Sequence, residues 1–594
     1  MTVTDSWRAW RADPLLVAGV VLIGLQTCLR AFALLGSYFW QDDFFHLSLF
    51  RRTGLSWGFV VRDHNGHLEM GTNLVYALVG ANPSLSFLPA ALLILALQLV
   101  ASGLLLAVLR LLFGRSPWIL LPFTAYLFTP LALATVTWFA AGLQALPLQI
   151  AMLTALLGGI RAYRSRSWQW AAVSVAGTAT GLFFWEKAVF VVPALVAVLL
   201  LVEEAGTPWR RGLRQVADFW PFLLPHVLLV AAYLPFYLSL GGPSVKPTLG
   251  DALPSAAETL FAMLLPGLFG GPWTTEGAES TVTADPGTVR AVVVAVLALG
   301  VVAVSIRLRG VRAVKAWLLV LGYIAADVVL VQIGRGDYLS MAARDPRYIT
   351  DALPVIVIGC CAAFSGPRRA LSAAPRWARP AGVVAPAAAV SALLASCLLT
   401  NLLVIGELQH RPSQDYLAGV METMAADPAR SVVSSQPPIY VALNNAFDLE
   451  DTLHGLGREY VFDRPGTDMG IFDRDGILRP VALLEPIMQA SGPVAGCGWA
   501  LPAEDQPIGF VPIWFGLQVL RFTYVSPSEV TLHLAVGDDR QDLTVPAGTG
   551  KAMFVVTGQQ GPMSLRASGA PAGAVCVDDF FVGTPWPEGR SANS

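Results

Sequence analysis

Two adjacent aspartates, Asp42 and Asp43, stand between aromatic residues in the segment Tyr38–His46, just after the first strongly apolar stretch of the chain. Carboxylates at a membrane surface are costly to desolvate, so they usually have a functional role or a specific partner. One of the two has the chemistry of a general base towards a hydroxyl group, while the other orients an acceptor or holds a cation. The alternative is structural: an aspartate caps an interfacial helix whose Trp and Phe side chains form an aromatic belt.

A second polar segment, Arg62–Glu69, follows within the same long loop and contains His64, His67 and Glu69. These side chains have the chemistry to bind a polar substrate or a divalent metal ion. Two histidines three residues apart are a weak metal signal without a third ligand at a known spacing. The alternative interpretation is a polar loop that packs over the site.

A third group of polar residues belongs to loops that we predict to lie on the same membrane face. Guanidinium groups bind phosphate through two parallel hydrogen bonds, so a lipid phosphate would explain arginines on this face. The alternative is that these arginines pair with Asp337, Asp345 or Asp351. The members of the group are Glu186, Lys187, Arg335, Arg344, Arg347 and Tyr348.

The composition places these residues in a membrane protein. Of 594 residues, 55% are hydrophobic and 13% are charged, whereas soluble domains have roughly 25% charged residues. The net charge of −2 argues against nucleic acid as a partner. Apolar runs long enough to cross a bilayer predict eleven membrane-spanning helices. The predicted spans are 14–36, 86–109, 118–137, 142–160, 168–184, 188–202, 219–240, 291–306, 316–333, 351–365 and 381–405.

The distribution of basic residues predicts an orientation in the membrane. Arg8 and Arg11 precede the first span, and clusters of Arg and Lys recur in every second loop after it. The positive-inside rule assigns these loops to the cytoplasm, so an odd number of spans predicts an extracytoplasmic C-terminal region. The loops that carry the three polar groups then face outward as well. We expect Arg30, near the outer end of the first span, to extend its guanidinium to the interface.

The sequence beyond residue 405 has the character of a soluble domain. Tyr416–Ala426 is predicted as a linking helix, and apolar and polar residues alternate from Gly509 onward between short Gly, Pro and Asp turns. In Glu529–Val536 every second residue is apolar, which is typical of a half-buried strand. We therefore predict a mainly β, sandwich-like domain at 406–594 after a helical membrane domain at 1–405.

Cys497 and Cys576 are the two cysteines of this C-terminal region, and the other four lie in apolar runs. A cysteine in an apolar run behaves as a small hydrophobic residue. If the C-terminal region faces an oxidising compartment, Cys497 and Cys576 are its natural disulfide pair.

Taken together, these features resemble the GT-C superfamily of integral membrane glycosyltransferases, over residues 14–405 in organisation. In the superfamily's protein O-mannosyltransferases and aminoarabinose transferases, a long first external loop carries an acidic pair, which Asp42-Asp43 matches. In the O-mannosyltransferases a histidine follows, as His46 does here. The turn Gly181–Ala188 resembles the family's Gly-Leu-…-Lys-Gly-Pro turn, although Ala188-Val189 replaces the Gly-Pro. The C-terminal region resembles, in placement, the external carbohydrate-binding β-sandwich of actinobacterial arabinosyltransferases.

The resemblance implies an inverting glycosyltransferase of the plasma membrane. It would move a hexosyl or pentosyl group from a polyprenyl-phosphate donor to a glycan, lipid or protein acceptor outside the cytoplasm. Asp42 or Asp43 would deprotonate the acceptor hydroxyl, and outer cations would stabilise the leaving lipid phosphate. No cofactor is certain, and because members of the superfamily differ in their use of a divalent cation, that cation stays open. The expected substrate-binding residues are His46, His64, His67, Glu69, Glu186, Lys187, Arg344, Arg347 and Tyr348.

Two other classes of protein fit parts of the pattern. A transporter or flippase of envelope precursors is expected to have ionisable residues within its spans. Here the spans contain few beyond Arg30, His226 and Asp327, and polar groups concentrate in the outer loops. A non-enzymatic scaffold that displays a cell-wall-binding domain would need only one span.

Overall fold

The computed structural model describes residues 13–64, 66–81, 86–240, 248–274, 285–335, 339–365, 381–442, 448–488, 492–502, 504, 506–510, 516–557 and 562–590. The chain divides into two compact units. The first comprises Met1–Phe39 and Thr53–His410, and the second comprises Trp40–Arg52 and Arg411–Ser594. The short segment that carries Asp42 and Asp43 therefore belongs to the same unit as the C-terminal region.

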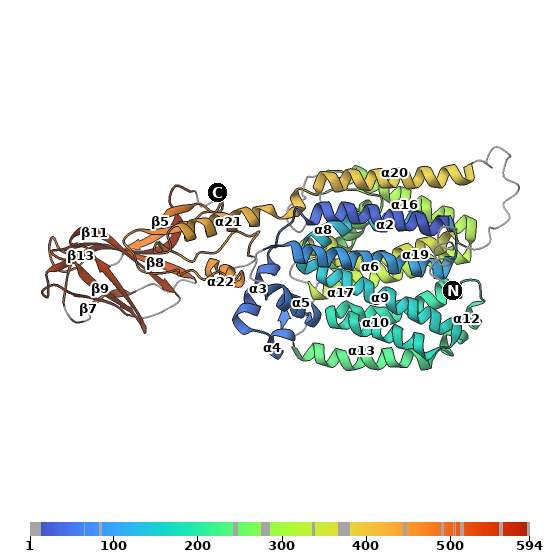
Figure 1. Ribbon diagram of the computed structural model, residues 1–594, viewed down its shortest axis with the longest axis horizontal. Helices are drawn as coiled ribbons and strands as arrows, with labels where there is room; N and C mark the ends of the chain where they lie inside the picture. Colours follow the sequence, from blue (N-terminus) through green and yellow to red (C-terminus); the bar gives the residue numbers. More distant parts are fainter. Residues whose placement is uncertain are drawn as a thin grey trace, which may run out of the picture. The chain divides into compact units, whose positions relative to one another are not determined.

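The first unit consists of apolar helices that run side by side, together with short connecting helices (Figure 1). Its long helices are α2 (Pro14–Leu34), α6 (Leu88–Phe113), α9 (Phe139–Ser165), α10 (Trp168–Phe184), α13 (Trp220–Leu240), α16 (Thr288–Arg309), α17 (Val311–Gly334) and α20 (Ala381–Val404). Shorter helices complete it: α4 (Trp57–Val60), α5 (Met70–Gly80), α7 (Leu120–Phe128), α8 (Leu131–Thr137), α11 (Val191–Val198), α12 (Trp209–Ala217), α14 (Leu249–Glu258), α15 (Leu265–Leu268), α18 (Leu339–Arg344) and α19 (Leu353–Phe364).

The predicted count of eleven membrane spans is not confirmed. Among the described residues, six helices are long and apolar enough to cross a membrane, or seven if the bent pair α7 and α8 forms one span. The predicted spans 188–202 and 351–365 are helical but short, and 118–137 is broken with a bend of 43°. Helix α9 is the centre of the unit, because 83% of its most apolar window is buried, against 11% for α16. The helical membrane region predicted from composition is confirmed.

Arg30 does not extend to the membrane interface as expected, but is fully buried. Its guanidinium donates hydrogen bonds to the Thr129 carbonyl at 3.2 Å and to Asn401 Oδ1 at 3.4 Å. Asn401 in turn donates to the Phe128 carbonyl at 2.8 Å. Helix α7 ends at Phe128, so both side chains bind its C-terminal carbonyl groups, which carry partial negative charge. These bonds explain how a cation is tolerated inside the helix bundle.

Close packing of α9 against α10 fixes the segment that follows α10. A Cβ atom on Gly158 would lie 2.7 Å from Ser174 N, and one on Gly177 would lie 2.7 Å from Ala155 N. Ser174 Oγ also donates to the Ala155 carbonyl at 2.7 Å. Small residues let two membrane helices approach this closely. The end of α10, and with it the start of the 3₁₀ helix η2 (Glu186–Phe190), is held against α9 in this way.

The second unit contains a β-sandwich, as the sequence predicted. A four-stranded sheet in the order β10-β9-β12-β7 shares one apolar core with part of a seven-stranded sheet in the order β11-β8-β13-β5-β4-β3, in which β6 pairs with β13. The largest fully buried side chains of this core are Phe522, Phe554 and Phe580. The strands are β3 (Ser431–Val432), β4 (Met469–Phe472), β5 (Leu478–Met488), β6 (Trp499–Leu501), β7 (Gln506–Phe510), β8 (Leu517–Ser526), β9 (Val530–Val536), β10 (Asp539–Val545), β11 (Gly548–Thr557), β12 (Pro562–Ser568) and β13 (Val575–Pro587).

Three helices accompany the sheets of the second unit: α3 (Asp42–Thr53), α21 (Arg411–Ala426) and α22 (Leu449–Gly455). Helix α21 covers the linking helix predicted at Tyr416–Ala426. Helix α3 is attached by hydrogen bonds from Gln41 Nε2 to the Ile439 carbonyl at 3.0 Å and from Ser48 Oγ to the Asp451 carbonyl at 2.9 Å. These contacts, between positions 398 and 403 residues apart, are why α3 groups with the C-terminal region.

The predicted disulfide between Cys497 and Cys576 is present. It joins the turn before β6 to β13, with a Cα–Cα distance of 4.9 Å and a sequence separation of 79. The other four cysteines, Cys28, Cys360, Cys361 and Cys397, are free thiols.

Replacing Cys497 and Cys576 together by alanine is expected to loosen the sandwich. By the loop-entropy relation, the crosslink stabilises the unit by about 4 kcal/mol through its restriction of the unfolded chain. Hydrogen exchange followed by mass spectrometry of the full-length protein should therefore show faster exchange in β6, β8 and β13. Exchange in α9 and α10 should not change, and Cys28→Ala, at an exposed free thiol, is the matched control. Unchanged protection of the three strands would contradict a stabilising role.

Candidate functional site

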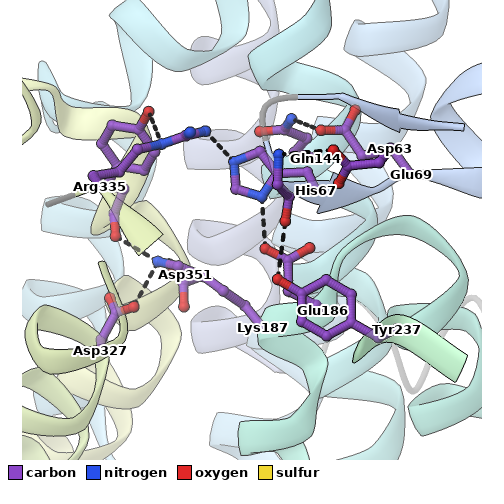
Figure 2. Close-up of polar contacts among 12 residues, drawn as sticks. Asp63, His67, Glu69, Gln144, Glu186, Lys187, Tyr237, Asp327, Arg335 and Asp351 are labelled. Atoms are coloured by element: carbon purple, nitrogen blue, oxygen red, sulfur yellow. Dashed lines mark hydrogen bonds and ion pairs between the residues drawn. The ribbon is translucent and has the colours of Figure 1, made fainter. Parts of the chain in front are cut away.

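A cluster of polar side chains lies at one end of the first unit's helices, where four chain segments meet (Figure 2). The segments are the hairpin of β1 (Asp63–His64) and β2 (His67–Leu68), the 3₁₀ helix η2, the end of α17, and the 3₁₀ helices η6 (Pro346–Tyr348) and η7 (Thr350–Ala352). In the hairpin His64 pairs with His67, and Gly66 has a φ of 81°. Such a positive φ suits glycine in a tight hairpin turn. Tyr237 of α13 donates its hydroxyl to the Gly66 carbonyl at 2.9 Å and so anchors the turn.

A chain of polar contacts runs from Glu186 through His67 to Arg335 (Figure 2). Glu186 Oε1 lies 2.6 Å from His67 Nδ1, and an Arg335 guanidinium nitrogen contacts His67 Nε2. Arg335 Nε donates to the Tyr348 hydroxyl at 3.0 Å. Because a guanidinium only donates hydrogen bonds, His67 Nε2 must accept and Nδ1 must carry the proton that goes to Glu186. The contacts therefore define a neutral imidazole in one tautomer.

The electrostatic surroundings of His67 favour the same neutral form. Burial lowers the pKa of His67 below its usual value of 6.5, and the neighbouring Arg335 and Arg347 lower it too, while Glu186 opposes them. The side chains of both residues are largely buried, with 14% of His67 and 12% of Glu186 exposed. A positive charge on His67 would leave the Arg335 guanidinium facing another donor.

Lys187 is bound inside the protein by three acceptors. Its Nζ donates to Asp327 Oδ1 at 2.5 Å, to the Tyr348 carbonyl at 2.6 Å and to Asp351 Oδ1 at 3.1 Å. Burial by itself lowers the pKa of Lys187, but the two carboxylates outweigh burial and raise it. An ammonium group has three N–H donors, and all three have acceptors here. The contacts favour a structural role for Lys187 over the phosphate contact expected from the sequence.

The arginines of the third polar group have different surroundings. Arg347 lies 2.7 Å from Asp345 and stacks on the rings of Trp138, at 4.3 Å, and Tyr348, at 4.6 Å. Burial raises the pKa of Asp345 to about 6, against the opposing effect of Arg347. Arg344 instead binds Glu258 at 2.5 Å and Asp285 at 3.2 Å. Both arginines therefore pair with acidic residues. Asp345 was among the partners expected from the sequence, whereas Glu258 and Asp285 were not.

Two further predicted residues, Glu69 and His64, lie near the hairpin. Glu69 is buried directly before α5 and accepts a hydrogen bond from Gln144 of α9 (Figure 2). His64 is partly buried and stands opposite His67 in the strand register. Within the described part of the chain, no group of three or more His, Cys, Asp or Glu side chains is arranged to hold a metal ion. The expectation of a divalent cation therefore stays a prediction.

The acidic pair and His46 belong to the second unit, at the start of α3. Asp43 is fully buried, and its Oδ2 accepts a hydrogen bond from Trp40 N at 2.8 Å. Asp42 is only partly buried, and His46 is buried beside Phe45. The residue before the pair, Gln41, has a φ of 42°, which is unusual for a residue with a side chain. The alternative interpretation, in which an aspartate caps the start of a helix, therefore fits Asp43. Asp42 is the more accessible of the two carboxylates.

Sequence reasoning did not select several residues of the cluster as site residues. Asp327 and Asp351 bind Lys187, Tyr323 donates to Asp351 Oδ2 at 3.1 Å, and Gln144 binds Glu69. The signal for Asp327 was present, because a carboxylate within an apolar span needs a partner. Its partner is 140 positions away along the chain, and no sequence pattern connects the two.

Comparison with known proteins gives structural likeness only. No family model matches the sequence, and no curated protein matches it. ArnT from Cupriavidus metallidurans bound to undecaprenyl phosphate has a TM-score of 0.41 at 15% identity, over 76% of this chain and 92% of that one. Its apo structure has a TM-score of 0.42 at 14% identity, over 75% and 85% of the two chains. The arabinosyltransferase EmbB from Mycobacterium smegmatis has a TM-score of 0.34 at 11% identity, over 96% of this chain and 64% of that chain.

Because all three TM-scores are below 0.5, the likeness does not bear on activity, and the case for function rests on the site's own residues.

Replacing Lys187 by methionine is expected to destabilise the first unit. The change leaves the buried carboxylates of Asp327 and Asp351 facing each other without a cation, and breaking a buried ion pair typically costs about 3–5 kcal/mol. Thermal unfolding of the full-length protein in detergent measures the loss. The double variant with Asp327→Asn should recover part of it, since one negative charge is removed. A single variant as stable as the wild type would contradict the structural role.

Proposed function

We propose that this protein is a membrane glycosyltransferase of the GT-C type, acting at the outer face of the plasma membrane. It transfers a hexosyl or pentosyl group from a polyprenyl-phosphate donor to a glycan, lipid or protein acceptor. The N-terminus is cytoplasmic and the C-terminal β-sandwich is extracytoplasmic, where it binds carbohydrate. The oxidised pair Cys497 and Cys576 supports an oxidising location for the sandwich.

One observation carries the proposal: arginines lie directly beside an apolar recess. The recess is small and is lined mainly by apolar side chains from η4 (Thr259–Leu264), α17 and α18, including Met263, Val328 and Leu339. Tyr348 also lines it, and the hydroxyl of Tyr348 binds Arg335 while its ring stacks on Arg347. A molecule that fits both parts has an anionic head and an apolar chain. A polyprenyl phosphate has this structure, and guanidinium groups suit its phosphate.

The phosphate contacts fall to Arg335 and Arg347 in this proposal, with Lys187 as the group that fixes their surroundings. In the reaction the acceptor oxygen attacks the anomeric carbon, and the bond from that carbon to the phosphate oxygen breaks. The configuration at the carbon inverts, and the lipid phosphate leaves with the negative charge. The arginines stabilise that charge as it develops, in a setting that excludes much of the water. Arg344, paired with Glu258 and Asp285, contributes at most indirectly.

Asp42 is the proposed general base, and its carboxylate takes the proton of the acceptor hydroxyl. Asp43 is less suited, because it is fully buried and bound to Trp40 N. His46 in the second unit, and His64, Glu69 and Glu186 in the first, are proposed to contribute to substrate binding.

Asp42→Asn is expected to lower the rate of transfer by roughly 100-fold to 10,000-fold, the usual contribution of a general base. Asp43→Asn should cost far less, because an amide oxygen still accepts from Trp40 N. The measurement is sugar transfer from a radiolabelled polyprenyl-phosphate donor by full-length protein in nanodiscs. Asp218→Asn, at an exposed position after α12, is the matched control. Full transfer by the Asp42 variant would remove Asp42 as the base, and full transfer by both variants would remove the acidic pair from the mechanism.

A further inference from the structure

The chain of contacts from Glu186 to Arg335 is built from segments that are far apart in the sequence. Glu186 opens η2 after α10, His67 is in β2, and Arg335 directly follows α17. The contact between His67 and Arg335 joins positions 268 residues apart, and that between His67 and Glu186 joins positions 119 apart. His67 is thus the one side chain through which these contacts connect the two ends.

Each end of this chain presents a different chemistry. Arg335 also binds Tyr348 beside the apolar recess, so its end suits an anion attached to a lipid. At the other end Glu186 Oε1 accepts the hydrogen bond from His67 Nδ1–H, while Glu186 Oε2 is buried and has no hydrogen-bond partner among the described residues. The indole nitrogen of neighbouring Trp185 is also buried and also has no hydrogen-bond partner among the described residues. A buried carboxylate oxygen without a partner can accept a hydrogen bond from a hydroxyl or amine group of a ligand.

A glycosyl phosphate carries both partners on adjacent groups, namely a phosphate and the hydroxyls of a sugar ring. We propose that His67 is a positioning residue that holds Arg335 and Glu186 at a fixed separation, so that Arg335 binds the phosphate and Glu186 the sugar ring of one donor molecule. The proposal rests on the function proposed above and adds the residue that sets the spacing. His67 itself need not touch the donor.

The charged groups facing His67 make this arrangement depend on its protonation. Glu186 approaches from η2, Arg335 from the end of α17 and Arg347 from η6, while the Trp185 ring meets the imidazole edge to face at 6.1 Å. A protonated imidazole keeps its bond to Glu186 but has no lone pair for Arg335. The protonated imidazole and the Arg335 guanidinium then repel each other. The contact to Arg335 is therefore lost before the contact to Glu186.

Two substitutions separate the two ends. The amide nitrogen of asparagine is positioned like Nδ1, so His67→Asn retains a donor for Glu186 and loses the acceptor for Arg335. The amide oxygen of glutamine is positioned like Nε2, so His67→Gln retains the acceptor for Arg335 and loses the donor for Glu186. The two variants differ by one methylene group and neither titrates, so each is the control for the other.

The experiment measures equilibrium binding to full-length protein in nanodiscs with two kinds of probe. Decaprenyl monophosphate reports the Arg335 end alone. Decaprenyl-phosphoryl mannose and decaprenyl-phosphoryl arabinose report both ends, and the tighter-binding of these two is used. Loss of a hydrogen bond to a charged group is expected to weaken binding about tenfold.

His67→Asn should weaken binding of the monophosphate about tenfold, whereas His67→Gln should bind it as the wild type does. His67→Gln should instead lose the extra affinity that the sugar provides. In the wild type, monophosphate binding should weaken as the pH falls through the lowered pKa of His67, and His67→Gln should not show this additional loss.

Wild-type affinity of both variants for both probes would overturn the proposal, and so would an equal loss by both variants for both probes. Failure of the proposed function has a different signature, since it concerns transfer and not binding. A wild-type protein that binds both probes, with the variant pattern above, but transfers no sugar contradicts the function and leaves the positioning role intact. A wild-type protein that transfers sugar while both variants match it contradicts only the positioning role.

Discussion

The ammonium group of Lys187 is the contact on which the rest of the candidate site depends. It joins α17, through Asp327, to η7, through Asp351, and to the backbone of Tyr348. A buried ion cluster of this kind is stable only if every charge has a partner, because desolvation otherwise outweighs attraction. The residues with proposed chemical roles are neighbours of this cluster in the chain: Glu186 precedes Lys187, and Arg347 precedes Tyr348. The cluster thus gives the more exposed groups a rigid support.

The fold was predictable from the sequence where one physical rule dominates. Apolar runs gave the positions of the helices, and the alternation in Glu529–Val536 gave strand β9, whose apolar side chains are buried as expected. The number of membrane spans was harder to predict, because length and hydropathy do not distinguish a broken or short helix from a complete span. The break between α7 and α8 lies at Thr129-Pro130, and the carbonyl groups there accept hydrogen bonds from Arg30 and Asn401, which are distant in sequence.

The candidate site was predictable as a set of residue types and not as a set of contacts. His67, Glu186, Arg347 and Tyr348 were all selected, and the structure brings them together. What sequence reasoning could not supply was how each charge is used. Lys187 and Arg347 are both cations next to aromatic rings, yet Lys187 donates to three buried acceptors whereas Arg347 lies against two ring faces. Such differences arise from long-range packing, which no local pattern encodes.

The buried guanidinium of Arg30 has a wider consequence for how the first unit responds to its surroundings. Its charge is balanced by carbonyl and amide oxygens, which do not titrate, so the brace between α2 and the end of α7 keeps the same strength at any physiological pH. The Asp345 carboxyl group beside Arg347, by contrast, has a pKa that burial raises to about 6, so its charge changes near that pH. The unit therefore combines a frame that is indifferent to acidity with a proton-sensitive polar end. A change of pH in this range would alter the polar end while the brace at Arg30 stays unchanged.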